Sequence, residues 1–332
     1  MEPTAPDPGP VTLPQLAYAV AVDAHRHFGR AAAACDVTQP TLSMQIGKLE
    51  RALGVVLFDR ARSPVTPTAA GRRVVDQARV ALREAARVRE AAGDPAGEVA
   101  GELRLGVIPT LAPYLLPRLV PELARRHPRL ALVVEERVTD GVLDGVRRGL
   151  LDAALVATPA AGADLVERPL FREPFLGYVG PSHRLAGRTT IAPADLSLDD
   201  LWLLAEGHCF RTQTVRLCGQ RGRRAGGGVA PSGDVVACTA AVRFESGNLE
   251  TLKRLVERDV GMTLLPALAA ADLPPAQRAL LRPFRAPAPS RDVRVVLRRG
   301  AERARLVEAV AAAIVATLPA ELRRPTARER AG

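Results

Sequence analysis

Two short helical segments separated by only three residues are the feature that most restricts how the N-terminal part of this chain can fold. The first is the alanine-rich segment of residues 30–34, which is followed by Cys35, Asp36 and Val37. Thr38 then stands where a hydroxyl can cap the first turn of the next helix. One stripe of that helix is apolar and consists of Leu42, Ile46, Leu49 and Leu53. Two helices joined by so short a turn form a helix-turn-helix.

The side of the second helix opposite the apolar stripe carries short or hydrogen-bonding groups. Such a face can enter the major groove of DNA, where its donors and acceptors meet base edges and phosphates. We expect DNA contacts from Thr38, Gln39, Pro40, Thr41, Ser43, Gln45 and Lys48. A solvated helix face has a similar composition, so the flanking sequence must decide between the two interpretations.

Residues 54–68 predict a wing beside this helix-turn-helix. The segment contains a turn, a short strand and a second turn with basic residues at its tip. Arg60 and Arg62 are placed there to lie against DNA phosphates. A helix that precedes the pair begins after Thr12, where Gln15 can complete a capping box.

Residues 11–68, which we assign to a DNA-binding domain, resemble the winged helix-turn-helix of LysR-type transcriptional regulators. The match rests on Ala31-Ala32-Ala33, Gln39-Pro40-Thr41-Leu42-Ser43, Leu49-Glu50, Leu57-Phe58 and Thr66-Pro67-Thr68-Ala69-Ala70-Gly71. The resemblance implies double-stranded promoter DNA as a partner and RNA polymerase as a further one. The formal net charge of +10 agrees with a polyanionic partner, because a positive field attracts nucleic acid.

Residues 69–95 predict a long linker helix. Small apolar residues recur along it at spacings of four and three, which is typical of a coiled-coil seam: Val74, Ala78, Ala81, Ala85, Val88 and Ala92. The family resemblance implies that this helix pairs two subunits, in a homo-oligomer that is a dimer of dimers. A seam so poor in large side chains can equally pack on the domain that follows. The glycines and Pro95 at residues 93–97 indicate a hinge at its end.

The remainder of the chain predicts an α/β regulatory domain. Strand patterns at residues 103–108, 130–135 and 153–156 alternate with helices that start near Ala112 and at Thr139. This order favours a parallel sheet with ligands at the carboxyl ends of its strands. The resemblance implies two lobes, similar to periplasmic binding proteins. We assign residues 101–176 and 282–318 to lobe I, with its last strand at residues 293–297, residues 177–281 to lobe II, and residues 1–10 and 319–332 to tails.

The sequence around Cys209 concentrates reactive groups. Cys209 and Cys218 are nine positions apart, and His208 and Arg211 lie beside the first of them. A cysteine reacts with peroxide as the thiolate, which a positive neighbour or a helix N-terminus stabilises. If the segment is helical, the two alpha carbons lie roughly 13 Å apart at about 1.5 Å per residue, so a disulfide requires refolding. The alternative is that both cysteines are small buried hydrophobes.

Within the LysR-type regulators, this half of the chain resembles the hydrogen-peroxide sensors. The match includes residues 207–213, Cys218, residues 249–252, residues 261–269 and Ile108-Pro109-Thr110. The resemblance implies that Cys209 is the peroxidatic cysteine and that Cys218 resolves it in a disulfide. It also implies a peroxide pocket in which Arg291 stabilises developing charge, formed by Thr110, Thr139, His208, Arg211 and Arg291.

The chain departs from those sensors at two places. Thr212 stands where they usually have an acidic residue, which affects any proton relay at that point. A basic, glycine-rich segment longer than the usual connection follows Cys218. Its Cys238 is either an alternative resolving thiol or a bystander, whereas Cys35 is expected to serve packing.

Composition and spacing restrict the remaining functions. No apolar run approaches the roughly twenty residues that span a bilayer, so we expect a cytoplasmic protein without a membrane partner, in which a disulfide is transient. No clustered His/Cys spacing, phosphate-binding glycine loop or catalytic triad occurs, so neither a metal nor a cofactor nor enzyme activity is expected. Two alternatives remain. One is a LysR-type regulator whose inter-lobe cleft binds a small-molecule effector and whose thiols are inert, and the other is a thiol peroxidase.

Overall fold

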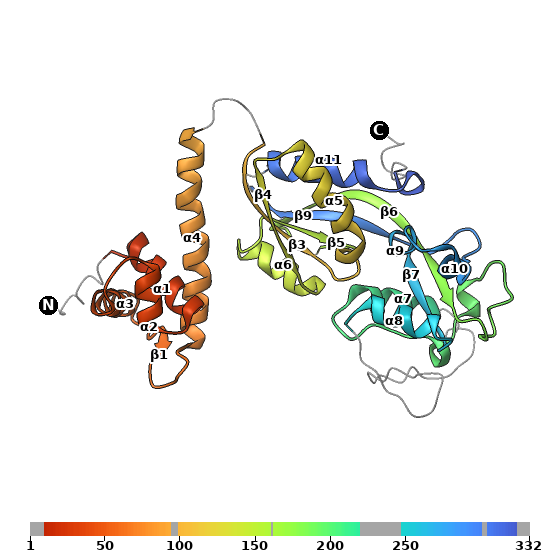
Figure 1. Ribbon diagram of the computed structural model, residues 1–332, viewed down its shortest axis with the longest axis horizontal. Coiled ribbons are helices and arrows are strands. Elements are labelled where there is room, and N and C mark those ends of the chain that lie inside the picture. Colours follow the sequence, from red (N-terminus) through yellow and green to blue (C-terminus); the bar gives the residue numbers. More distant parts are fainter. Residues whose placement is uncertain (1–9, 94–98, 161, 220–246, 301–303, 324–332) are drawn as a thin grey trace. The chain divides into compact units, whose positions relative to one another are not determined.

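The computed structural model describes residues 10–93, 99–160, 162–219, 247–300 and 304–323 (Figure 1). The chain divides into two compact units, Met1–Glu98 and Val99–Gly332. No helix in the described ranges is both long and apolar enough to cross a bilayer.

Helices and a two-stranded hairpin form the first unit around a small apolar core. α1 (Leu13–His25), α2 (Phe28–Ala34) and α3 (Gln39–Leu53) are followed by β1 (Phe58–Asp59), β2 (Thr66–Pro67) and the long α4 (Ala69–Gly93). The predicted capping box is present, because the Thr12 hydroxyl accepts from the Gln15 backbone and the Gln15 side chain accepts from the Thr12 backbone. Leu42, Ile46 and Leu49 of α3 are buried, as the apolar stripe predicts. The helix-turn-helix prediction is therefore confirmed.

The start of α2 differs from the sequence expectation, whereas the short wing strand is present as predicted. α2 begins at Phe28, not at residue 30, because the His27 imidazole accepts from the backbone N–H groups of Gly29 and Arg30 at 3.0 and 3.3 Å. Strand β1 is only two residues long. It pairs with β2 in antiparallel register, Phe58 opposite Pro67, and so forms the base of the wing.

The seam predicted along α4 falls into two different environments. Ala78 and its neighbour Val75 are buried, and α4 packs along α1, where Arg79 of α4 forms an ion pair with Asp23 at 2.5 Å. Val88, further along the helix, is 70% exposed. The early part of the seam therefore packs within the unit, whereas Val88 lies exposed on a later turn. Residues 94–97 of the predicted hinge lie outside the described residues.

The second unit is built on a mixed sheet with the strand order β4-β3-β5-β9-β6-β7, and β8 also pairs with β6 (Figure 1). The strands are β3 (Gly101–Val107), β4 (Leu130–Glu136), β5 (Ala153–Val156), β6 (Leu165–Val179), β7 (Met262–Pro266), β8 (Leu281–Pro283) and β9 (Ser290–Arg298). Strand β3 runs parallel to β4 and β5, as predicted. Strand β9 is antiparallel to β5 and β6, so the expectation of a parallel sheet was right only for the first three strands.

Helices cover this sheet and complete the two lobes (Figure 1). They are α5 (Ala112–Arg126), α6 (Thr139–Arg147), α7 (Cys209–Gly219), α8 (Leu249–Glu257), α9 (Ala267–Ala270), α10 (Pro275–Arg278) and α11 (Ala304–Thr317). Three short 3-10 turns accompany them, η1 (Pro193–Asp195), η2 (Leu198–Asp200) and η3 (Ala320–Leu322).

Two separate apolar cores define the two lobes. One includes Leu105 and Val142, and the other includes Tyr178 and Trp202. The fifteen-residue strand β6 serves both, because Phe171 lies in the first core and its later residues lie in the second. The two lobes are therefore joined by continuous strands. The second core extends from Phe175 to Phe284, and Leu322 packs in the first core.

Candidate functional site

Helix α3 presents the polar side on which the DNA contacts are predicted. Thr38, Gln39, Pro40 and Lys48 are exposed, and Thr41, Ser43 and Gln45 are half-buried. The Thr38 hydroxyl caps the helix by accepting from the Thr41 backbone N–H, and its oxygen lies 2.9 Å from the Thr41 hydroxyl. The N-terminal turn is therefore rigid as well as exposed, which is the arrangement by which a recognition helix contacts base edges.

The two wing arginines have different surroundings. The Arg60 guanidinium forms an ion pair with Glu50 at 2.8 Å and lies 5.0 Å from the centroid of the Phe28 ring. Arg62 pairs only locally with Asp59, and its side chain is 74% exposed. Arg60 thus attaches the wing to α3 and α2, whereas Arg62 projects into solvent at the tip.

Sequence reasoning did not identify how Gln45 is held. The Gln15 side-chain amide donates to the Gln45 amide oxygen at 3.3 Å, while the Gln15 oxygen caps α1 by accepting from Thr12 at 3.0 Å. Gln15 is buried, with 8% of its surface exposed. The capping residue of α1 therefore also orients a side chain of the recognition helix.

In the second unit, Thr110 and Thr139 lie at the same edge of the sheet. Thr110 follows β3 and Thr139 follows β4, and these neighbouring strands are parallel, with Val107 opposite Glu136. Thr110 is 2% and Thr139 is 8% exposed. The Thr139 hydroxyl oxygen has no hydrogen-bond partner among the described residues. Since buried polar atoms are nearly always paired, this oxygen is available to a ligand or a water molecule.

Arg291 is held at this edge by two partners. Its Nε donates to Glu173 Oε1 at 2.8 Å, and both side chains are fully buried. Its Nη1 donates to the Thr110 hydroxyl at 2.9 Å, and its Nη2 donates to the Thr110 carbonyl oxygen at 3.1 Å. The guanidinium also lies 5.5 Å from the Phe210 ring centroid. Arg291 therefore joins the strand edge of lobe I to the residue that follows Cys209.

Helix α7 brings Cys209 to the same place. Cys209 is the first residue of the helix and packs against the core of lobe I. Gln213, one turn later, donates to the carbonyl oxygen of Ala157 at 2.7 Å, just beyond β5. A Cβ added to Gly207 would lie 3.8 Å from Val138, the residue before Thr139. The N-terminal turn of α7, where free backbone N–H groups carry partial positive charge, thus faces the carboxyl ends of β3, β4 and β5.

The two thiols lie at opposite ends of α7 and are both free. Nine residues of helix separate their alpha carbons by roughly 13 Å, about twice the reach of a disulfide. Cys218 is 7% exposed. Burial raises the pKa of its thiol to about 11, and the negative charge of Asp200 acts in the same direction. The helical form therefore keeps Cys218 protonated and away from Cys209.

The polar residues around Cys209 do not all turn toward it. His208 is buried, and this burial lowers its pKa, which favours the neutral imidazole. The Arg211 guanidinium donates to the Leu204 carbonyl oxygen at 3.1 Å within lobe II. Thr212 is exposed. Cys238 and the glycine-rich segment around it lie outside the described residues.

A second polar cluster beside Arg291 was missed by sequence reasoning. Lys253 is 6% exposed, donates to Glu250 at 2.7 Å and lies 5.4 Å from the Tyr114 ring centroid. Burial, together with the neighbouring Glu250, raises the pKa of Tyr114 far above its usual range. Tyr114 belongs to α5 of lobe I, whereas the other two belong to α8 of lobe II. The only sequence signal was that Lys253 is one of two lysines, with Lys48, in a chain whose other basic residues are nearly all arginine.

The described residues contain no group of three or more His, Cys, Asp or Glu side chains that could hold a metal ion. The groups that the described contacts bring to the sheet edge are the Cys209 thiol, the hydroxyls of Thr110 and Thr139, and the paired guanidinium of Arg291.

A winged helix-turn-helix followed by a two-lobed α/β domain defines a class of transcriptional regulators, and the family comparisons agree with this class. Residues 13–72 match the bacterial regulatory helix-turn-helix of the lysR family, and residues 96–319 match the LysR substrate binding domain. The chain therefore belongs to the LysR family of transcriptional regulators.

Relatives within that family are named as activators of hydrogen peroxide-inducible genes. The chain is 37% identical over 311 residues to the DNA-binding transcriptional dual regulator OxyR of Escherichia coli, covering 93% of this chain and 96% of the relative. It is 39% identical over 304 residues to a probable hydrogen peroxide-inducible genes activator of Streptomyces viridosporus, covering 91% and 93%.

Solved structures show the same relationship. A full-length OxyR mutant of Pseudomonas aeruginosa superposes with a TM-score of 0.70 at 36% identity, covering 91% of this chain and 97% of that one. A hydrogen-peroxide-bound OxyR mutant of Corynebacterium glutamicum gives a TM-score of 0.57 at 31% identity, covering 92% of each chain. The resemblance to the peroxide sensors of the LysR family is therefore confirmed.

Proposed function

We propose that this protein is a regulator in which hydrogen peroxide oxidises Cys209, after which a disulfide to Cys218 changes the binding of promoter DNA. The observation that carries the proposal is the position of both thiols on one helix, with Cys209 packed on lobe I and Cys218 buried at the far end. Because the helix keeps the thiols apart, the disulfide and α7 are mutually exclusive. The names of the OxyR relatives support peroxide as the signal.

The proposed reaction consumes one peroxide and two thiols. The Cys209 thiolate attacks one peroxide oxygen, the O–O bond breaks, and a sulfenic acid and one water form. Once α7 refolds, the Cys218 thiol gives up its proton and its sulfur attacks the sulfenic sulfur. The S–S bond forms, and the displaced hydroxide takes up that proton and leaves as a second water. Sulfur is oxidised and peroxide is reduced, and a thiol reductant restores both cysteines. The protein acts once per signal and is not an enzyme.

The peroxide pocket is proposed to consist of Thr110, Thr139, His208 and Arg291. The buried Thr139 hydroxyl has no described partner, which leaves it available to a peroxide oxygen. Arg291 supports the developing negative charge on the leaving oxygen through Thr110, to which it donates. Arg211, predicted for the same pocket, donates instead to Leu204, so we assign it to holding α7 against lobe II.

The output of the switch is proposed to be a change in oligomer packing on DNA. The winged helix-turn-helix would contact the major groove through α3, and the exposed later turns of α4, around Val88, would pair subunits within a dimer of dimers. RNA polymerase is the proposed further partner at an activated promoter. Because its target is promoter DNA, the protein is proposed to work in the cytoplasm.

Peptide mass mapping after peroxide treatment tests the disulfide. We expect a Cys209–Cys218 linkage in the wild type, none in Cys209→Ser, and an unchanged linkage in the control Cys35→Ser. A linkage from Cys209 to Cys238 in place of Cys218 would reassign the resolving thiol. No linkage to Cys209 at all would refute the proposed chemistry.

Footprinting of promoter DNA with reduced and oxidised protein tests the output. We expect the footprint to change on oxidation and to stay in its reduced form in Cys209→Ser. A full transcriptional response to a small metabolite in Cys209→Ser would favour an effector-binding regulator with inert thiols. Catalytic peroxide consumption with a thiol reductant, unaffected by DNA, would favour a thiol peroxidase.

A further inference from the structure

A groove of about 630 Å³ opens beside α7, and none of the residues assigned to the peroxide pocket lines it. Its walls come from α7, from the η1 turn and from the segment between β8 and β9. The residues that line it are Phe175, Ala192, Pro193, Gln213, Arg216, Leu217, Arg285, Ala286, Pro287, Pro289 and Ser290. Ligand sites in proteins have volumes of roughly 300–1,000 Å³, so the groove is of a size that takes a small molecule.

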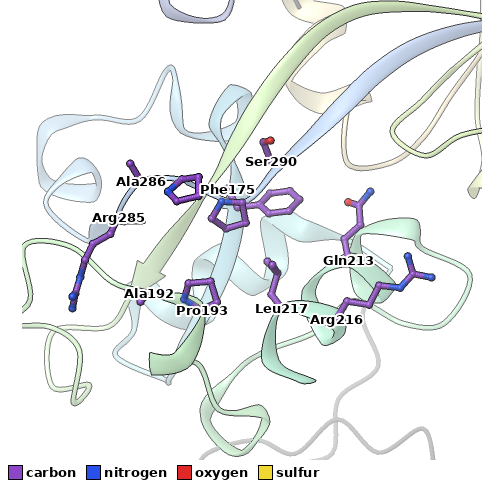
Figure 2. A pocket seen from close by; sticks show the side chains of 11 residues that line it. Phe175, Ala192, Pro193, Gln213, Arg216, Leu217, Arg285, Ala286 and Ser290 are labelled. Atoms are coloured by element: carbon purple, nitrogen blue, oxygen red, sulfur yellow. The ribbon is translucent and has the colours of Figure 1, made fainter. Parts of the chain in front are cut away.

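The two ends of the groove are cationic. Figure 2 shows Arg285 at one end and Arg216 at the other, with Phe175, Leu217 and Pro193 between them. Both arginines are exposed, and neither has a salt-bridge partner among the described residues. No aspartate or glutamate belongs to the described lining either. A groove with this charge attracts an anion, and guanidinium groups bind carboxylates with paired hydrogen bonds.

The middle of the groove is apolar and stiff. Phe175 is 3% exposed, and the Pro193, Pro287 and Pro289 rings have few rotamers to lose when a ligand binds. The backbone N–H of Phe175 donates to the Pro289 carbonyl at 2.8 Å, which fixes the floor to the β8–β9 segment. Such a preformed apolar surface favours a hydrocarbon body over a bare inorganic anion.

We propose that this groove binds an organic carboxylate with an apolar body and that the bound carboxylate stabilises α7 as a helix. Gln213, Arg216 and Leu217 contribute to the groove from the stretch of α7 between the two thiols. Refolding of this stretch would remove one wall of the site. A ligand that binds only the helical form of α7 stabilises that form against refolding. The stabilising free energy grows with the ligand's concentration and affinity.

One consequence rests on the function proposed above. If the Cys209–Cys218 disulfide requires α7 to unfold, occupancy of the groove opposes disulfide formation, so the carboxylate sets the threshold for the peroxide response. The binding itself concerns the reduced protein alone and does not depend on the redox chemistry.

Calorimetric titration of the reduced, full-length protein tests the site, with 2-naphthoate as the probe. Its neutral analogue 2-naphthylmethanol and inorganic phosphate serve as ligand controls. We expect 2-naphthoate to bind more tightly than either control. We also expect Arg216→Gln to weaken 2-naphthoate by at least about fivefold, because a charge-assisted hydrogen bond is lost, and Arg285→Gln at the opposite end to weaken it by less, because a single carboxylate pairs with one end only. Arg188→Gln, which removes an exposed arginine of the same lobe outside the groove, should leave the affinity unchanged.

Equal effects of Arg188→Gln and Arg216→Gln on the affinity for 2-naphthoate would refute the proposed site. Equal affinities for 2-naphthoate and phosphate would refute the proposal that the ligand has an apolar body.

Amide hydrogen exchange tests the stabilisation of α7. The probe should slow exchange at residues 213–218 in the wild type and not in Arg216→Gln. Unchanged exchange rates at saturating 2-naphthoate would refute the proposal that the ligand stabilises α7. If no Cys209–Cys218 disulfide is ever formed, the proposed redox function fails, whereas these binding results stand or fall by themselves.

Discussion

Arg291 and Glu173 face each other across β9 and β6 as a fully buried ion pair, 2.8 Å apart. Glu173 also accepts from the Leu268 backbone N–H at 2.9 Å, and Arg291 donates to Thr110. The pair thus ties together the two strands shared by the lobes, the start of α9 and the turn after β3.

Replacement of Glu173 by Gln should destabilise the reduced protein strongly. Removing one partner of a buried ion pair leaves the other charge uncompensated, at a cost of about 3–5 kcal/mol in the free energy of unfolding. Denaturant titration followed by circular dichroism measures the loss. Glu308→Gln is the matched control, because Glu308 pairs with Arg168 at the surface and its loss should cost under about 1 kcal/mol. Similar losses in the free energy of unfolding for the two variants would mean that the buried pair stabilises the fold no more than a surface pair does.

The raised pKa of Cys218 predicts a particular alkaline instability. The folded thiol ionises near pH 11 because it is buried, whereas a free thiol ionises near pH 9. Unfolding therefore releases a proton between these values, so the stability that depends on this group is present below pH 9 and is lost as the pH rises toward 11. The rise in pKa from 9.0 to about 11 corresponds to about 3 kcal/mol.

Denaturant titrations of reduced wild type and Cys218→Ala at pH 8 and at pH 10.5 test this prediction. The wild type should lose more stability than the variant between these two pH values, since all other titrating groups are shared. Cys218→Ala has its own constant cavity cost, which cancels in the pH difference. Identical pH dependence in the two proteins would show that Cys218 is more accessible than its 7% exposure indicates.

Lys253→Gln should weaken the contact between α8 and α5. The Lys253 ammonium is 8% exposed, pairs with Glu250 and lies over the Tyr114 ring, so its loss leaves Glu250 without its cation. We expect a loss of about 1–3 kcal/mol in the free energy of unfolding. Arg254→Gln, one residue along the same helix, removes a 68% exposed charge and should cost less than about 1 kcal/mol. Equal losses in the free energy of unfolding for Lys253→Gln and Arg254→Gln would mean that the Lys253 pair contributes no more than a surface ion pair.

The parts of this structure that the sequence predicted depend on short-range signals. The caps at Thr12 and Thr38, the stripe of α3 and the first three strands of the second unit each involve residues within one element or its neighbours. Their physical causes are local hydrogen bonds and apolar periodicity, which a sequence displays directly.

The parts that were missed depend on pairing across the chain. Glu173 lies 118 positions before Arg291, and only the antiparallel register of β6 and β9 places them opposite each other. The cluster of Tyr114 with Lys253 likewise needs α5 and α8 to meet across the lobes. The direction of the Arg211 side chain, toward Leu204, depends on packing within lobe II. No periodicity in the sequence encodes such partners.

Substitutions of the two wing arginines should affect DNA affinity and the free energy of unfolding differently. Arg62, with its side chain 74% exposed, can contact a phosphate at little structural cost, so Arg62→Ala should reduce the slope of log affinity against log salt by about 1 and leave the unfolding free energy unchanged. Arg60→Ala also loses the Glu50 pair and the contact with Phe28, and should destabilise the first unit by about 1 kcal/mol.

Fluorescence anisotropy with promoter DNA at several salt concentrations, paired with thermal unfolding of each variant, measures both effects. Lys48→Ala, at an exposed position of α3, is the comparison for loss of a cation without loss of a described ion pair. A normal salt slope in Arg62→Ala would remove the wing tip from the DNA interface. An unaltered melting temperature in Arg60→Ala would mean that the ion pair with Glu50 contributes nothing measurable to the stability of the fold. Arg60 would then be assigned to a phosphate contact, as the sequence first predicted.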